Sequence, residues 1–164
     1  MTIAPTLQRH LGEQKVDYDV LPHEPTMSSM RTAEACHVSG DRFAKGVVLR
    51  DGSSYWLAVL PASHQIRLAD LEKHLGCHLE FATEPEVEQL FQDCERGAVP
   101  PLGSCYGLDM IVDESIKEQP DVYFEAGDHA TLVHMTRDDF AKLNAQRTRF
   151  SWRFDPLIRR KKAE

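Results

Sequence analysis

The stretch FAKGVVLRDGSSYWLAVL (43–60) decides how this chain folds locally, because two β-rich runs flank an Asp-Gly pair. β-Branched, aromatic and long apolar residues dominate both runs, and Asp-Gly is a preferred pair for the tight turn of a β-hairpin. Lys45 is the odd residue in an alternation that places Phe43, Val47 and Leu49 on one face of the first strand. The stretch therefore predicts a hairpin whose lysine either extends to the rim of the sheet or points into a pocket.

Helices and strands are mixed over the rest of the chain, without the regular alternation of parallel α/β folds. Helices are expected near 7–12, 32–38, 68–75, 83–91 and 136–144, and further strands at 16–21, 78–82, 110–116, 121–127 and 130–135. Thr83 and Glu86 form a capping-box pattern, and Gly76 is expected to end the preceding helix. We predict one α+β domain with a mixed sheet over residues 1–143, followed by a basic tail over residues 144–164.

Bulk properties indicate an ordinary globular protein. A chain of 164 residues with 41% hydrophobic content can build one domain with a proper core. No apolar run approaches the roughly 20 residues of a membrane span, and the N-terminal segment lacks the pattern of a signal peptide. The four cysteines are scattered without a CxxC motif, so we expect reduced thiols. These features predict a cytoplasmic protein that does not associate with membranes.

Charge is distributed unevenly along the chain. The net charge is −7, yet residues 144–164 carry seven basic and two acidic side chains, which leaves an acidic body with a net charge of −12. The overall sign argues against DNA binding. The tail is either a solvated appendage or an arm that contacts phosphate, for which Arg159, Arg160, Lys161 and Lys162 are the candidates.

A second informative stretch is ERGAVPPLGSCYGL (95–108), which holds three glycines and a Pro-Pro pair. No regular helix or central strand tolerates this composition, so the stretch is expected to form a shaped loop. Backbone N–H groups of such a loop, together with the ammonium of Lys45, suit a small anionic or ester-bearing substrate.

Other kinds of site have weaker signals. His74, Cys77 and His78 have spacings compatible with metal ligands, but Gly76 interrupts the helix that would align them. Cys94 is flanked by Asp93 and Glu95, which disfavour a thiolate. Motifs of serine hydrolases, P-loop proteins and dinucleotide-binding proteins do not occur. A further loop thiol, Cys105, is expected to pack rather than to react.

The triplet Gly-Asp-His at 127–129 follows an expected strand. Gly-Asp is ordinary turn chemistry, so one reading is a purely structural turn. The other reading places His129 at the mouth of a pocket.

Taken in order, these pieces resemble the YbaK/prolyl-tRNA-synthetase-associated editing domain family. The resemblance covers roughly residues 5–143 and is carried by FAKGVVLRDG (43–52), LAVLPASH (57–64), DCERGAVPPLGSCYGL (93–108) and VYFEAGDH (122–129). It implies a mixed, mostly antiparallel central sheet flanked by helices. It also implies a deacylase that acts in trans, hydrolysing the ester of mischarged tRNA without metal or other cofactor.

The resemblance also assigns roles to residues. It implies that Lys45 lies at the terminal adenosine and the ester, and that backbone amides of the loop hold the aminoacyl end. It implies that His129 tunes which amino acid fits, while the attacking water is oriented partly by the vicinal hydroxyl of the substrate. The expected catalytic positions are therefore Lys45 and Gly97, and the expected substrate-binding positions are Ala98, Val99, Pro100, Pro101, Gly127 and His129.

The substrate stays open between several small amino acids. Alanine on a proline tRNA is the leading expectation, with serine, cysteine and threonine as alternatives, because Gly46 stands where some family members carry a polar residue. An aminoacyl-tRNA synthetase is a further partner to consider. Two alternative functions remain: a non-catalytic module that binds tRNA or a synthetase, and a metal- or thiol-dependent hydrolase of another ester.

Overall fold

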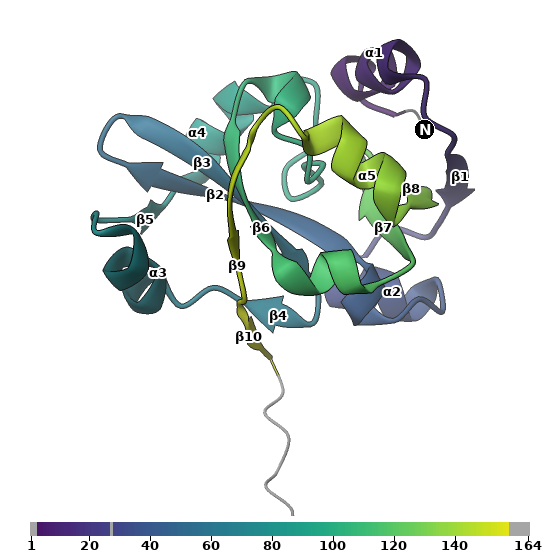
Figure 1. Cartoon of the computed structure of the whole chain (residues 1–164). Coiled ribbons are helices and arrows are strands. Elements are labelled where there is room, and N and C mark those ends of the chain that lie inside the picture. Colours follow the sequence, from purple (N-terminus) through teal and green to yellow (C-terminus); the bar gives the residue numbers. More distant parts are fainter. Residues whose placement is uncertain (1–2, 27, 158–164) are drawn as a thin grey trace, which may run out of the picture.

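A five-stranded mixed sheet forms the centre of the fold, with strand order β5-β2-β3-β6-β9 (Figure 1). The computed structural model describes residues 3–26 and 28–157. Strands β2 (Ala44–Asp51) and β3 (Ser54–Pro61) form the antiparallel hairpin that the sequence predicts. β5 (Glu80–Phe81) pairs antiparallel with β2, whereas β6 (Asp109–Asp113) and β9 (Thr148–Trp152) continue the sheet in parallel from β3.

A second sheet is entirely antiparallel and has the order β1-β8-β7. It consists of β1 (Asp19–Pro22), β8 (Thr131–Thr136) and β7 (Asp121–Glu125). An isolated bridge between Phe43 and Tyr123 joins the start of β2 to this sheet. Short strands β4 (His64–Gln65) and β10 (Asp155–Pro156) form one further pair. The predicted α+β class with a mixed sheet is confirmed. The central sheet is not mostly antiparallel as expected, because two of its strand pairs are antiparallel and two are parallel.

Five α-helices cover the sheets: α1 (Pro5–Gln14), α2 (Ser29–Ala35), α3 (Leu68–Leu75), α4 (Glu84–Leu90) and α5 (Arg137–Asn144). Thr83 forms the predicted capping box with Glu86, and Gly76 ends α3 in the left-handed conformation. α2 begins earlier than expected because Ser28 caps it, accepting a hydrogen bond from the Arg31 amide at 3.2 Å. Short 3₁₀ segments lie at Gly40–Arg42, Ser104–Tyr106 and Glu114–Glu118.

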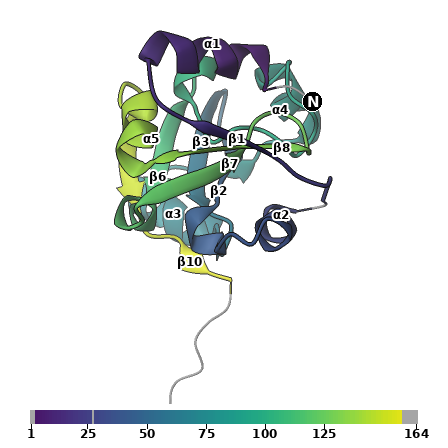
Figure 2. The ribbon, with the colours of Figure 1, turned by 90° about the vertical axis from the view of Figure 1, so that its right-hand side faces the viewer.

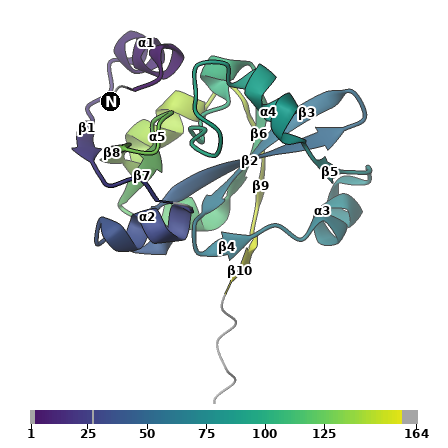
Figure 3. The same ribbon diagram turned by 180° about the vertical axis from the view of Figure 1, so that it is seen from behind.

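Alternating residues of the hairpin feed two apolar clusters on opposite faces of the central sheet. Val48, Leu57 and Val59 join residues of α1, α5 and the second sheet, whereas Leu49 and Leu60 pack with residues of α3. Figure 2 shows α1 and the second sheet together, and Figure 3 shows α3 and β5 at the opposite end of the molecule.

The segment after residue 143 differs from the expected division into domain and tail. β9 pairs with β6, and Phe154 is only 3% exposed. The Phe154 amide donates a hydrogen bond to the buried Asp113 carboxylate at 2.9 Å. Residues 144–157 therefore pack as part of the domain. The four candidate basic residues, Arg159, Arg160, Lys161 and Lys162, lie outside the described residues.

Among the helices of the described residues, none is both long enough and apolar enough to cross a membrane.

Candidate active site

The glycine- and proline-rich loop packs against the hairpin strand that carries Lys45. Ala98, Pro100 and Pro101 are buried, and a Cβ atom on Gly46 would lie 3.3 Å from the Cα of Pro101. Any larger residue at position 46 would therefore press on the loop. Gly97 has a φ of +82°, a backbone conformation that glycine adopts without strain.

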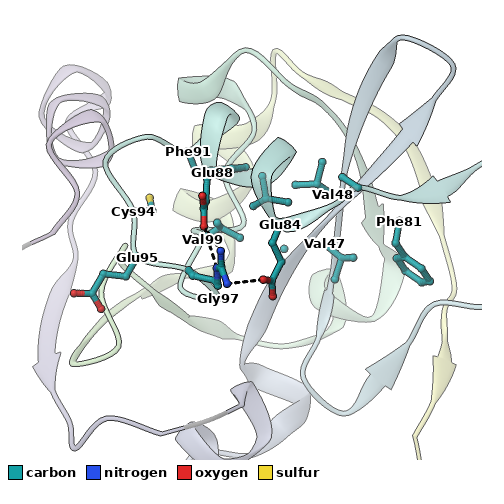
Figure 4. Close-up of a pocket in the computed structure, with 14 residues that line it drawn as sticks. Val47, Val48, Phe81, Glu84, Glu88, Phe91, Cys94, Glu95, Gly97 and Val99 are labelled. Carbon is teal, nitrogen blue, oxygen red and sulfur yellow. Dashed lines mark hydrogen bonds and ion pairs between the residues drawn. The ribbon is translucent and has the colours of Figure 1, made fainter.

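Two cavities meet at this loop. The first has a volume of about 330 Å³ and lies between β2, α4 and the loop. Figure 4 shows Val47, Val48 and Val99 around it, with the half-exposed ring of Phe81 at its rim. We call this cavity the apolar lobe. Its lining suits a flat apolar group such as an aromatic or purine ring.

The second cavity, which we call the polar lobe, has a volume of about 650 Å³. Hydroxyl, carboxylate and imidazole side chains line it, among them Ser28, Thr32, Glu125 and His129. Gly97 belongs to the lining of both lobes. A ligand with one apolar and one polar part could therefore occupy both lobes and pass Gly97 at their junction.

Arg96 also lines both lobes, where its guanidinium is held by carboxylates. It pairs with Glu84 at 2.7 Å and with Glu88 at 2.6 Å, as the dashed lines in Figure 4 show. These pairs are exposed to solvent, so their main effect is to orient the side chain.

The turn after β7 places one of its two predicted site residues at the cavity. His129 lines the polar lobe, and its Nε2 contacts the Arg96 carbonyl. Gly127 is instead buried, and a Cβ atom there would lie 2.7 Å from the Cβ of Ala4. Gly127 thus shapes the turn, whereas His129 borders the space where a ligand could bind.

Lys45 lies on β2 opposite Leu60. Its Nζ donates hydrogen bonds to the His64 carbonyl at 2.8 Å and to the Ala62 carbonyl at 3.5 Å. Burial lowers the pKa of Lys45. Lys45 is not among the described residues that line either lobe, but its neighbours Gly46 and Val47 line the apolar lobe. The structure thus brings the strand of Lys45, but not its ammonium, to the loop.

The loop also offers unused donors. In the described part of the chain, neither the Gly97 amide nor the Val99 amide donates a hydrogen bond. Gly97 is exposed at the junction of the lobes, and Val99 is half-buried beside it. Their N–H groups are available to an anionic or carbonyl oxygen.

The two thiols near the loop are poor nucleophiles. Burial raises the pKa of Cys94 to about 12, and the nearby Asp93 carboxylate adds to this effect. Burial likewise raises the pKa of Cys105 to about 12. Because the thiolate is the reactive form, both groups are expected to be inert at neutral pH.

The two histidines of the group with spacing compatible with metal ligands, His74 and His78, contact other side chains. His78 Nδ1 pairs with Glu72 at 2.8 Å, and the His74 ring contacts that of Trp152 with a centroid distance of 4.5 Å. Among the residues that the structure describes, no group of three or more His, Cys, Asp or Glu side chains has the geometry to hold a metal ion.

The sequence analysis did not single out three polar residues of the polar lobe region: His23, Thr32 and Glu125. They come from segments far apart in the chain, so spacing could not reveal them. One signal was present, since Glu125 is a charged residue that follows Val122, Tyr123 and Phe124 at the end of β7, directly before a turn.

Comparison with known proteins identifies the family. A family model described as an aminoacyl-tRNA editing domain matches residues 23–143. The chain belongs to the aminoacyl-tRNA editing domain family. Lys45, the loop residues Gly97–Pro101, Gly127 and His129 all lie within the matched range. A search of curated proteins gave no match.

Solved structures support this editing-domain fold. A crystal structure of a candidate trans-editing enzyme for prolyl-tRNA synthetase matches with a TM-score of 0.78 and 20% identity, covering 94% of this chain and 99% of the other. A hypothetical protein matches with a TM-score of 0.78 and 16% identity, covering 91% and 98%. A scaffold protein from a study of epitope grafting matches with a TM-score of 0.78 and 19% identity, covering 93% and 96%. At these identities the likeness concerns the fold.

Proposed function

We propose that this editing-domain protein is a deacylase that acts in trans in the cytoplasm, hydrolysing the ester between a small amino acid and a mischarged tRNA. Membership of the editing-domain family supports the substrate class. The observation that carries the proposal is the junction at Gly97, where two cavities of different polarity meet beside unused backbone N–H groups. Alanine on a proline tRNA is the first substrate to test.

The two lobes suit the two ends of such a substrate. The apolar lobe, with Phe81 at its rim, fits the terminal adenine, because bases commonly stack on aromatic side chains. The polar lobe fits the aminoacyl group. This arrangement places the scissile ester near Gly97, at the junction.

An aminoacyl ester is already activated, so positioning a water molecule and stabilising the oxyanion suffice for catalysis. Water, oriented partly by the vicinal hydroxyl of the substrate, adds to the ester carbonyl. Loop N–H groups and the Lys45 ammonium stabilise the tetrahedral oxyanion, whose collapse breaks the bond to the ribose oxygen. That oxygen takes up a proton, and the products are the free amino acid and tRNA.

A deacylation screen tests the proposal. Purified protein is incubated with a panel of tRNAs mischarged with alanine, serine, cysteine or threonine, and with correctly charged controls. Selective hydrolysis of one mischarged species is expected. Binding of tRNA or a synthetase without hydrolysis of any ester would favour a non-catalytic module instead.

His129→Ala should change selectivity more than rate. The imidazole borders the polar lobe and contacts the Arg96 carbonyl, so its removal enlarges the space for the amino-acid side chain. Discrimination between alanyl, seryl and cysteinyl esters should shift by about 1–3 kcal/mol toward the larger side chains. The measurement is kcat/KM for each ester. An unchanged ranking would remove His129 from the specificity pocket.

Cys94→Ala should retain activity, because the protonated thiol cannot act as a nucleophile at neutral pH. Wild-type activity should also survive treatment with a chelator. The check is the initial rate of deacylation in each case. Inactivation by the chelator that added zinc reverses, or loss of turnover in folded Cys94→Ala, would favour a metal- or thiol-dependent hydrolase.

The basic tail should contribute affinity for tRNA rather than chemistry. Charge reversal at Arg159, Arg160, Lys161 and Lys162 is preferable to deletion from residue 147, because deletion would remove β9 from the central sheet. Reversal should weaken tRNA binding and flatten its salt dependence, by a log–log slope of about 0.7–0.9 for each lost phosphate contact. The single-turnover rate at saturation should stay nearly constant. An unchanged affinity and salt slope would mean that phosphate is bound elsewhere.

A further inference from the structure

A buried carboxylate forms part of the wall of the polar lobe. Glu125 ends β7, is 7% exposed, and is among the residues that line the cavity. Its Oε2 lies 3.3 Å from His23 Nε2, and its Oε1 lies 3.3 Å from the Thr32 hydroxyl. Removing a carboxylate from water is costly unless it gains partners. The position of Glu125 therefore requires either complete satisfaction by the protein or a ligand.

The described protein groups do not fill all the hydrogen-bond acceptor positions of the Glu125 carboxylate. An ionised carboxylate can accept about four hydrogen bonds. The Thr32 hydroxyl has one hydrogen to donate, and the Ser28 carbonyl is nearer to it, at 3.0 Å, than Glu125 is. Oε1 can therefore accept a donor from a molecule in the polar lobe.

His23 contacts the other carboxylate oxygen of Glu125. Its Nδ1 faces the Glu24 carbonyl at 2.8 Å, and a carbonyl can only accept, so Nδ1 carries a hydrogen. A second hydrogen then lies between His23 Nε2 and Glu125 Oε2, as imidazolium with carboxylate or as imidazole with carboxylic acid. A cation bound at Glu125 favours the carboxylate form in either case.

The rest of the lobe favours a cation. Its lining includes Glu84, Glu95 and Asp128 besides Glu125, with Arg96 and His129 as its basic members. Arg96 is already paired with Glu84 and with Glu88 of α4. The summed charge of the cavity wall is therefore negative, which suits a cationic group more than an anion.

We propose that Glu125 binds the α-ammonium group of the aminoacyl moiety, so that the protein requires a free amine and rejects esters of N-blocked amino acids. This inference rests on the proposed function, since it assigns one end of the substrate to the polar lobe. Burial raises the pKa of Glu125, which agrees with a carboxylate that is incompletely stabilised until a cation arrives.

The test uses each aminoacyl-tRNA that the protein hydrolyses in the deacylation screen. It compares that ester with its N-acetyl derivative on the same tRNA. Wild-type protein should hydrolyse the free-amine ester about tenfold faster or more, measured as kcat/KM. Glu125→Gln should lower kcat/KM for the free-amine ester by about tenfold and leave the N-acetyl ester little changed, so that the preference disappears. Glu34→Gln, an exposed carboxylate on α2, is the matched control and should keep the preference.

A binding measurement keeps the proposal testable if Glu125→Gln fails to fold. Wild-type protein should bind a non-hydrolysable 3′-alanylamido-adenosine about tenfold more tightly than its N-acetyl form. Equal hydrolysis of both esters, equal binding of both analogues, or a preference that folded Glu125→Gln retains would overturn the ammonium assignment alone. Failure of wild-type protein to hydrolyse any ester of the panel would overturn the proposed function, and this inference with it.

Discussion

Replacing Lys45 with alanine is expected to slow deacylation by about 100- to 1,000-fold, which corresponds to about 2–4 kcal/mol of transition-state stabilisation. Lys45 shares its face of β2 with Val47, which lines the apolar lobe two residues along the strand. Two residues of a strand span about 7 Å, and the lysine stem is long and flexible. We therefore expect the ammonium to leave the Ala62 and His64 carbonyls and to move toward the ester at the lobe junction when substrate binds.

The fold should survive this substitution, because the nearer of the two carbonyls that Lys45 contacts belongs to the half-buried His64. Loss of one hydrogen bond costs about 0.5–1.5 kcal/mol of stability. Lys45→Met retains the apolar stem without the charge and should be as inactive as Lys45→Ala. Lys73→Ala, on the exposed side of α3, is the matched control and should keep wild-type turnover. Single-turnover rates measure the loss of catalysis, and thermal unfolding measures the loss of stability. Full activity in Lys45→Ala would exclude the mechanism.

Local signals account for the parts of the fold that the sequence predicts well. The Asp-Gly turn between two β-rich runs defines the hairpin, and the capping box at Thr83 defines the start of α4. In both cases residues within a few positions of one another satisfy the backbone, so no distant partner is needed. The loop at 95–108 is predicted for the same reason, since glycine and proline exclude regular structure whatever surrounds them.

Features that depend on distant partners were not predictable in this way. β9 mixes one basic, two hydroxyl-bearing and two aromatic residues. Its place beside β6 depends on a parallel pairing across more than 30 residues. The contact between His23 and Glu125 joins positions 102 residues apart. The direction of the Lys45 ammonium depends on carbonyls beyond the end of β3. Tertiary packing decides each of these, and a single sequence does not record it.

One close contact links the hairpin to the loop and explains an oddity of the sequence. Gly46 stands where a strand residue would normally carry a side chain, and its missing Cβ leaves room for Pro100 and Pro101. The loop can then lie against the strand of Lys45. The hairpin and the loop, which local patterns predict separately, thus form one wall of the site, and glycine at position 46 lets them approach without displacing either one.

Gly97→Ala should lower turnover by about 100-fold, because a small displacement of a positioned group can cost that much in rate. Two physical effects act together at this position. Alanine is strained at a φ of +82°, and its Cβ would lie 3.3 Å from Cε1 of His129, at the edge of the polar lobe. If the backbone shifts to relieve the strain, the Gly97 N–H moves away from the ester. If His129 shifts to make room for the Cβ atom, its imidazole moves away from the amino-acid side chain.

Gly52→Ala is the matched control for this substitution. Gly52 also has a positive φ, of +58°, but nothing lies within 4 Å of a Cβ atom there, and it occupies the hairpin turn outside both lobes. The two variants should lose similar amounts of stability, about 1–2 kcal/mol from backbone strain. Only Gly97→Ala should lose turnover, in single-turnover rates at saturating and limiting substrate. Equal turnover in both variants would reduce the loop to a structural element, and the oxyanion would need other donors than the Gly97 and Val99 amides.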